Sequence, residues 1–380
     1  MTSRTRLFTG GPIFDGIQLH EGRAARFENG VFAGLEAQSG HARADKVTAL
    51  DGDVLCLGYT DLQVNGGDGI MFNDAPNVAT LARMAQAHRR LGATRILPTL
   101  ITDSVETTHA AIRAATDAIA QGISGIAGLH LEGPHLSVAR KGAHDAQFIR
   151  PMESADMTRL LEAKSHLPVL KVTLAPESTT SDQVKVLSAA GILVSLGHTD
   201  ADYTTCLGHV AAGARCATHL FNAMSQMDNR APGLVGVALD NGLMSAGLIA
   251  DAIHVHPATM RVAWRSKIGP GRIFLVSDAM AVAGTQKTEF KLNGRTIKRE
   301  AGQLRLTDGT LAGADLDLTR AVSVLVNQVD VPLPEALAAA TSGPAMLCGL
   351  ADHRLEVGRT TLSDMIRIRA DLSGAGPILP

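Results

Sequence analysis

The middle of the chain repeats one pattern, in which a short apolar run is followed by a stretch with apolar residues at helical spacing. Leu81, Met84 and His88, for example, follow the i, i+3, i+7 spacing of one helix face. Strands that alternate with helices assemble into a parallel sheet, and eight such units predict an α/β fold of the TIM-like (β/α)8 barrel type. The eight predicted strands are 54–62, 94–100, 126–131, 169–174, 192–196, 215–220, 245–250 and 273–276.

The two ends of the chain have a different pattern. In residues 1–53, short apolar pieces are separated by Gly10-Gly11, Asp15-Gly16 and Asn29-Gly30, which are hairpin signals. The expected partner is the far end of the chain, where 290–313 again shows short strands and turns and 365–368 alternates as a last strand. We therefore predict a barrel over 54–356 and a small, discontinuous β-sandwich domain built from 1–53 and about 357–380.

Composition narrows the class of protein. The 380 residues carry a formal charge of −2 and no long basic block, so nucleic acid and anionic membranes are poor candidate partners. The four cysteines lack CxxC spacing and are expected to be reduced thiols. The first eleven residues lack the apolar core of a signal peptide, and no apolar stretch is long enough to span a bilayer. We expect a cytoplasmic protein.

Three candidate metal ligands each follow an apolar run. Glu132 follows the run 126–131, His198 follows the fifth predicted strand, and His219 lies near the end of the sixth. A carboxylate at the end of a buried strand is costly unless it is ion-paired or bound to a cation, and a single histidine there is more often structural. The C-terminal ends of barrel strands converge, however, and three ligands with an open position are typical of catalytic zinc sites.

Other polar residues follow the remaining strands. Asp278 ends the eighth predicted strand and is either a helix cap or a general base that takes a proton from water. His254 is a candidate substrate contact, and Arg230 is either a solvated surface residue or a ligand for an anion, to which the Asn222-Ala223 backbone would also donate. Lys171 lies within the fourth strand, and we expect it to reach solvent or to form an ion pair.

Several ordered motifs resemble the N-acetylglucosamine-6-phosphate deacetylase family of the metal-dependent amidohydrolase superfamily. The resemblance covers nearly the whole chain, and although each motif is weak alone, the ordered series is specific. The motifs are Gly-Tyr-Thr-Asp-Leu-Gln-Val-Asn-Gly-Gly (58–67), His-Leu-Glu-Gly-Pro (130–134), Lys-Gly-Ala-His (141–144), Gly-His-Thr (197–199), Thr-His-Leu-Phe-Asn-Ala-Met (218–224), Ala-Asp-Ala-Ile-His-Val (250–255), Val-Ser-Asp-Ala (276–279) and Leu-Ala-Gly-Ala (311–314).

The resemblance implies hydrolysis of the N-acetyl group of N-acetylglucosamine 6-phosphate, in amino-sugar catabolism or cell-wall recycling. It implies one divalent metal ion, most simply Zn²⁺ although Fe²⁺ or Co²⁺ would fit, and a homodimer in which Arg230 reaches the neighbouring active site. The implied roles are metal binding by Glu132, His198 and His219; proton transfer by Asp278; carbonyl polarisation by His144; phosphate binding by Asn222, Ala223, Arg230 and His254; and pocket lining by Ala143, Leu311, Ala312 and Gly313.

One departure concerns the first barrel strand. Many amidohydrolases have His-x-His there to hold a second metal, whereas this chain has Gln63 and Asn65, which are poor ligands for a transition metal. This argues for a single metal ion, with Gln63 and Asn65 as candidate second-site residues only. Alternative functions are a deacetylase for N-acetylgalactosamine 6-phosphate, another amidohydrolase, or an inactive barrel acting as a scaffold.

Overall fold

A closed parallel barrel forms the centre of the molecule. The computed structural model describes residues 4–37, 44–351 and 354–378. Every neighbouring pair in its eight-stranded sheet is parallel, in the order β17-β16-β15-β14-β13-β12-β11-β8. The strands are β8 (Tyr59–Val64), β11 (Ala93–Ile101), β12 (Gly128–Glu132), β13 (Val169–Leu174), β14 (Leu193–Leu196), β15 (Cys216–Ala217), β16 (Ser245–Leu248) and β17 (Ile273–Leu275).

Backbone hydrogen bonds between β8 and the segment after β17 close the barrel. The Asp278 N–H donates to the Gln63 carbonyl over 3.0 Å, and the Asn65 N–H donates to the Ala279 carbonyl over 2.8 Å. Val64 and Ala279 form a parallel bridge at the same place. The predicted (β/α)8 architecture is confirmed.

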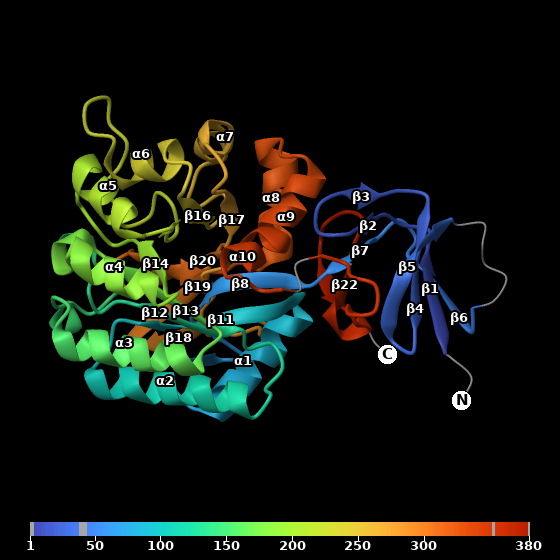
Figure 1. The fold of residues 1–380 in the computed structure, drawn as a ribbon, viewed down its shortest axis with the longest axis horizontal. Helices are drawn as coiled ribbons and strands as arrows, with labels where there is room; N and C mark the ends of the chain where they lie inside the picture. The colour runs from blue at the N-terminus through green and yellow to red at the C-terminus, as the bar shows by residue number, and fades with distance from the viewer. Residues whose placement is uncertain (1–3, 38–43, 352–353, 379–380) are drawn as a thin grey trace.

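Helices surround the strands (Figure 1). In α1, the side chains of Leu81, Met84 and His88 are buried against the barrel, as their spacing predicts, and Asn77 caps the helix by accepting from the Thr80 N–H. No helix among the described residues is long and apolar enough to cross a membrane. The helices are α1 (Val78–Arg90), α2 (Val105–Ala120), α3 (Ser154–His166), α4 (Ser181–Ala189), α5 (Tyr203–Ala212), α6 (Gly233–Asp240), α7 (Pro257–Ser266), α8 (Leu318–Val329), α9 (Leu333–Ala340) and α10 (Ser342–Leu347), with short 3-10 turns η1 (Val138–Arg140), η2 (Ala146–Phe148), η3 (Pro176–Ser178) and η4 (Leu362–Asp364).

Two sheets from the chain ends form the small β domain, and Figure 1 shows the N-terminal strands and β22 side by side at one end of the barrel. Phe8, Phe27, Leu55 and Met365 pack between these sheets. One sheet has the order β5-β4-β1-β6 and the other β23-β22-β7-β2-β3. Their strands are β1 (Thr5–Thr9), β2 (Ile13–Phe14), β3 (Leu19–His20), β4 (Arg23–Glu28), β5 (Val31–Ala37), β6 (Lys46–Ala49), β7 (Val54–Leu57), β22 (Met365–Ile368) and β23 (Ala375–Pro377).

The predicted strand 54–62 is two strands, so that prediction was wrong. β7 belongs to the small domain, and the chain enters the barrel only after Gly58, although we expected the boundary after residue 53. Val54 and Cys56 face the barrel core while Leu55 and Leu57 face the sandwich core. Because both faces of β7 are buried, its sequence is apolar throughout and merges with the following barrel strand. Of the predicted terminal module, residues 1–3, 38–43 and 379–380 lie outside the described residues.

We expected the segment 290–313 to join the terminal module, but it forms a sheet of its own. Its apolar face, including Leu292, Ile297 and Leu304, packs against Met280 after the last barrel strand. It therefore covers the C-terminal side of the barrel, where a bridge joins Ala279 to Ala314. Its strands, in the order β18-β19-β20-β21, are β18 (Glu289–Leu292), β19 (Arg295–Glu300), β20 (Gln303–Leu306) and β21 (Leu311–Ala314), and a nearby hairpin is formed by β9 (Gly66–Gly67) and β10 (Ile70–Met71).

Arg367 on β22 links the two chain ends, which gives a testable prediction. Its guanidinium donates to the Asp53 carboxylate over 2.5 Å and to the Leu50 carbonyl over 2.8 Å. Arg367→Met should lower the free energy of unfolding by about 1–3 kcal/mol, because hydrogen bonds to charged groups are lost. Denaturant unfolding measures this, with the exposed Arg369→Met as the matched control. Equal stability of the two variants would contradict the link.

Candidate active site and metal centre

Four of the predicted site residues meet at the C-terminal ends of barrel strands. Glu132 is the last residue of β12, while His198, His219 and Asp278 follow β14, β15 and β17. The last three have positive φ values of 47°, 31° and 50°, respectively. Non-glycine residues in this left-handed region are strained and cluster at functional sites, because the surrounding structure must hold them there. The side chains of all three residues line the cavity at this end of the barrel.

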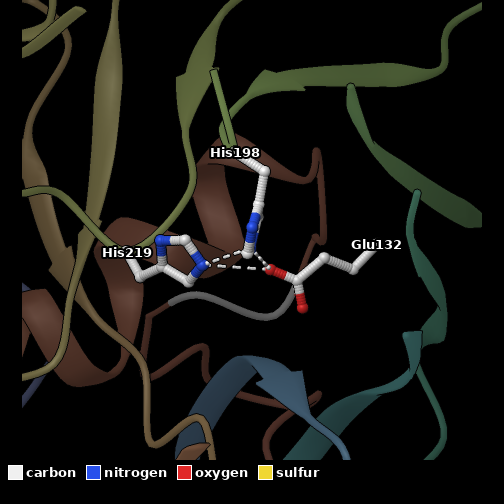
Figure 2. A group of neighbouring side chains, drawn as sticks. All are labelled: Glu132, His198 and His219. Carbon is white, nitrogen blue, oxygen red and sulfur yellow. Dashed lines mark hydrogen bonds and ion pairs between the residues drawn. The ribbon is translucent and has the colours of Figure 1, made fainter. Parts of the chain in front are cut away.

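Glu132, His198 and His219 form a compact triangle of possible ligand atoms, shown in Figure 2. The Glu132 Oε1 atom lies 3.2 Å from His198 Nε2 and 3.1 Å from His219 Nε2, and the two nitrogens are 3.0 Å apart. A tetrahedral zinc ion with bonds of about 2.0–2.1 Å would hold its donor atoms about 3.3 Å apart. The triangle therefore has the size of a three-ligand metal site.

The hydrogen bond of His198 on its far side prepares the ring for a cation. His198 Nδ1 lies 2.9 Å from the Arg140 carbonyl, which only accepts, so Nδ1 carries the proton and Nε2 has a free lone pair. His219 Nδ1 is buried and has no hydrogen-bond partner among the described residues. Lone pairs and a carboxylate that converge this closely repel one another unless a positive charge lies between them. The donor set therefore fits a divalent cation.

Two buried carboxyl groups have shifted pKa values in opposite directions. Burial opposes ionisation of Glu132, but the contacts with His198 and His219 outweigh it and hold the Glu132 pKa well below its usual value. Burial raises the Asp278 pKa, and the negative charge of Glu132 raises it further. A higher pKa makes Asp278 a stronger proton acceptor than a solvated aspartate. The site thus holds two carboxyl groups of different proton affinity, with that of Asp278 the higher.

His144 lies beside the triangle, with its ring centroid 4.4 Å from that of His198. Its Nδ1 atom is 2.8 Å from Thr102 Oγ1 and accepts from the Thr102 backbone N–H over 3.3 Å. A backbone N–H can only donate, so the ring proton is on Nε2. Burial, together with the nearby His198, lowers the His144 pKa to about 3. His144 is therefore neutral and offers one N–H donor.

These residues line a cavity of about 280 Å³. Of the predicted substrate contacts, it brings Ala143, Asn222, Ala223, His254, Leu311 and Gly313 together with Glu132, His144, His198, His219, Asn65 and Asp278. Ile101, Ile249, Met280, Leu292 and Thr310 complete much of the wall and were not predicted. Leu292, Thr310, Leu311 and Gly313 belong to the inserted sheet and its turns, so this sheet closes one side of the cavity.

Two predicted contacts lie elsewhere. Ala312, expected to line the pocket, is fully buried in the apolar cluster under the inserted sheet, because side chains alternate along β21 and only Leu311 and Gly313 face the cavity. Arg230 is exposed on the loop before α6 and is not among the residues that line the cavity.

Sequence reasoning missed two residues that hold predicted ones. Thr102 contacts His144, and Asp251 Oδ2 lies 2.6 Å from His254 Nδ1, so that the far edge of the His254 ring faces the cavity. Thr102 follows β11 directly and Asp251 comes soon after β16, which is the same signal that identified Glu132 and Asp278. They were missed because their contacts are with side chains rather than with a metal.

Lys171 corrects another expectation. It neither reaches solvent nor forms an ion pair, since its side chain is fully buried and Nζ has no hydrogen-bond partner among the described residues. Lys171 lies in the middle of β13, and its side chain points into the barrel interior beneath the site. The four cysteines are free, as expected, and Cys216 is a buried core thiol.

Comparisons with known proteins agree with this geometry. Residues 54–359 match the amidohydrolase family. The chain is 41% identical over 338 residues to an N-acetylgalactosamine-6-phosphate deacetylase of Shewanella sp., covering 88% of this chain and 85% of the relative. It is 32% identical to an N-acetylglucosamine-6-phosphate deacetylase of Haemophilus influenzae, covering 84% of each.

A solved structure extends the likeness to the whole fold. The crystal structure of N-acetylglucosamine-6-phosphate deacetylase from Pasteurella multocida superposes with a TM-score of 0.91 at 31% identity, covering 98% of this chain and 97% of that one. The match to the family covers the barrel and all three residues of the triangle. This chain is a member of the amidohydrolase family.

Proposed function

We propose that the chain hydrolyses the N-acetyl group of N-acetylglucosamine 6-phosphate to give glucosamine 6-phosphate and acetate. The observation that carries the proposal is the triangle of Glu132, His198 and His219 with Asp278 beside it, inside a cavity at the barrel mouth. The relatives from Haemophilus influenzae and Pasteurella multocida, named as deacetylases of this substrate, support it.

A single divalent ion completes the proposed site, held by Glu132, His198 and His219. Zn²⁺ suits one carboxylate and two imidazoles best, and Fe²⁺ or Co²⁺ accepts the same ligands. When bound, such an ion supplies Lewis-acid chemistry, lowering the pKa of water and polarising a carbonyl oxygen.

The protein's own side chains transfer the proton and polarise the substrate carbonyl. Asp278 takes a proton from the attacking water and then gives it to the nitrogen of the leaving amine. His144 donates its Nε2–H to the acetamide oxygen, where negative charge develops as water attacks. Because His144 is neutral and fixed by Thr102, the donor is already in place before the reaction begins.

The phosphate needs cationic and N–H donors, and the cavity offers some of them. Asn222, Ala223 and His254 line it, and we assign them to the sugar phosphate. Arg230 stands on an exposed loop away from its own cavity, so we propose that the protein is a homodimer in which Arg230 completes the neighbouring site. A cytoplasmic location is proposed from the four free cysteines.

The C4 epimer is a second candidate substrate. The relative from Shewanella sp., at 41% identity, is named as an N-acetylgalactosamine-6-phosphate deacetylase. The two substrates share the acetamide, the phosphate and the reaction, so the same metal triangle and base serve both.

Metal removal tests the cofactor. Dialysis of the purified protein against a chelator should lower bound metal from one equivalent per chain to below a tenth and abolish acetate release, because the ion activates water and carbonyl. Zn²⁺ should restore both. Substituting His219→Ala should prevent metal retention, whereas the exposed His166→Ala should not. Full turnover by metal-free protein would contradict the proposal.

Asp278→Asn tests the base. An amide cannot accept the proton, and a general base contributes roughly 10²–10⁴-fold, so kcat should fall by about 10³-fold. Metal content should stay at one equivalent, because Asp278 is outside the ligand triangle. The exposed Asp182→Asn is the matched control. A variant that keeps a tenth of the normal turnover rules Asp278 out as the base.

A substrate panel tests the sugar and the phosphate. Removing the 6-phosphate should raise KM by about 10–100-fold, since each charge-assisted hydrogen bond is worth about 1.5–3 kcal/mol. Acetate release is measured with N-acetylglucosamine, its 6-phosphate and N-acetylgalactosamine 6-phosphate. The ratio of kcat/KM for the two phosphates decides the epimer. Equal KM with and without phosphate would favour another amidohydrolase.

A further inference from the structure

The side-chain amides of Gln63 and Asn65 both point at one oxygen of Asp278. Asn65 Nδ2 lies 2.7 Å from Asp278 Oδ1, and Gln63 Nε2 lies 3.1 Å from the same atom. Both residues are buried, with exposed fractions of 1% for Asn65 and 0% for Gln63. No hydrogen bond to Asp278 Oδ2 is present within the described parts of the chain, so the two oxygens of this carboxylate are in different environments.

The chemistry of the partners fixes the direction of both amides. A carboxylate oxygen accepts hydrogen bonds, so the NH₂ groups and not the carbonyl oxygens must face Asp278. Gln63 Nε2 is also 3.3 Å and 3.4 Å from the two oxygens of Glu132, which fixes its orientation twice. An amide NH₂ is not a metal ligand, and here the Gln63 NH₂ group lies between the two carboxylates while the Asn65 NH₂ group contacts Asp278. This arrangement disfavours a second cation at Gln63 and Asn65.

The orientation leaves the carbonyl oxygen of each amide without a partner. Gln63 Oε1 and Asn65 Oδ1 are buried and have no hydrogen-bond partner among the residues described. Leaving a buried acceptor unpaired is unfavourable, because the group loses its hydrogen bonds to water. The contacts of the NH₂ groups with ionised oxygens must offset this cost, because charge-assisted hydrogen bonds are the stronger kind.

The backbone places the amides and the base in one rigid unit. The backbone carbonyl of Gln63 accepts from the Asp278 N–H, and the backbone N–H of Asn65 donates to the Ala279 carbonyl. Both bonds cross the strand pair that closes the barrel. A side chain on one strand therefore meets the base at the end of the other in a fixed register. Sites built on strands hold their geometry more closely than sites built on loops.

We propose that Gln63 and Asn65 are positioning residues that occupy Asp278 Oδ1 and leave Oδ2 as the oxygen that takes and returns the proton. Without the two donors, the carboxylate would be free to rotate and to spread the proton over both oxygens. The proposal rests on the proposed role of Asp278 in deacetylation. It gives the first-strand amides a function in proton transfer instead of a role in metal binding.

The near-isosteric variants Asn65→Leu and Gln63→Met test the proposal. Each removes the donor while keeping the volume of the side chain. Asn65→Leu should lower kcat at least tenfold, because a misplaced catalytic group costs up to about 10²-fold, while KM stays within threefold. Gln63→Met should act in the same direction and more weakly, since its contact is longer. Bound metal should remain at one equivalent per chain.

A matched control and a structural measurement make the test decisive. Asn73 is also a buried amide that donates to a carboxylate, Asp103, over 2.9 Å, but it does not touch Asp278. Asn73→Leu should keep kcat within twofold. A crystal structure of Asn65→Leu should show the Asp278 carboxylate rotated from its wild-type orientation, a measurement that does not depend on turnover.

The outcomes separate this proposal from the proposed function. Wild-type protein that releases no acetate from any hexosamine 6-phosphate refutes the function, and the crystal structure still decides the orientation of Asp278. An unrotated carboxylate, a kcat for Asn65→Leu within threefold of wild type, or a loss confined to KM overturns the positioning role.

Discussion

The chemistry of this protein depends on the hydrogen-bonded closure of the barrel between β8 and the segment after β17. This closure sets the register in which the Asp278 N–H meets the Gln63 carbonyl and the Asn65 N–H meets the Ala279 carbonyl. A shift by one residue would turn the side chains of one strand to the opposite face. Asp278 would then leave the mouth of the barrel, whereas Glu132, His198 and His219 would stay in place. The closing strand pair thus joins two otherwise separate parts of the site.

Burial of charge is the second constraint on the site. Glu132 and Asp278 are both removed from water, which is costly for two carboxylates so close together. Contacts with His198 and His219 hold the Glu132 pKa low. The Gln63 NH₂ group lies against oxygens of both carboxylates, and the Asn65 NH₂ group lies against Asp278. A cation in the triangle would satisfy the remaining acceptors. The site is therefore stable as a set, and the removal of one member changes the balance for the others.

The inserted sheet shows how a common barrel acquires a particular cavity. The ends of the barrel strands supply the acidic and histidine side chains of the site, but Leu292, Thr310 and Leu311 on the insertion supply part of the wall. Arg295 on β19 also donates to the Ala143 carbonyl and so ties the insertion to the loop that carries His144. The shape of the cavity and the position of His144 are thus coupled through a segment outside the barrel. The terminal sandwich lies at the other end of the molecule (Figure 1).

The sequence by itself determined the elements and the chemical types at their ends. Glu132, His198, His219 and Asp278 follow apolar runs, and the rule that parallel strands end at one face brings them together without further information. It could not separate β7 from β8, because a strand buried on both faces has no polar alternation, and it could not tell that Ala312 faces the core and Lys171 has no partner. Only the tertiary structure decided these points and the contact of Asn65 with Asp278. Such contacts join residues far apart in the chain, and their geometry follows from the register of packed strands, which no local pattern contains.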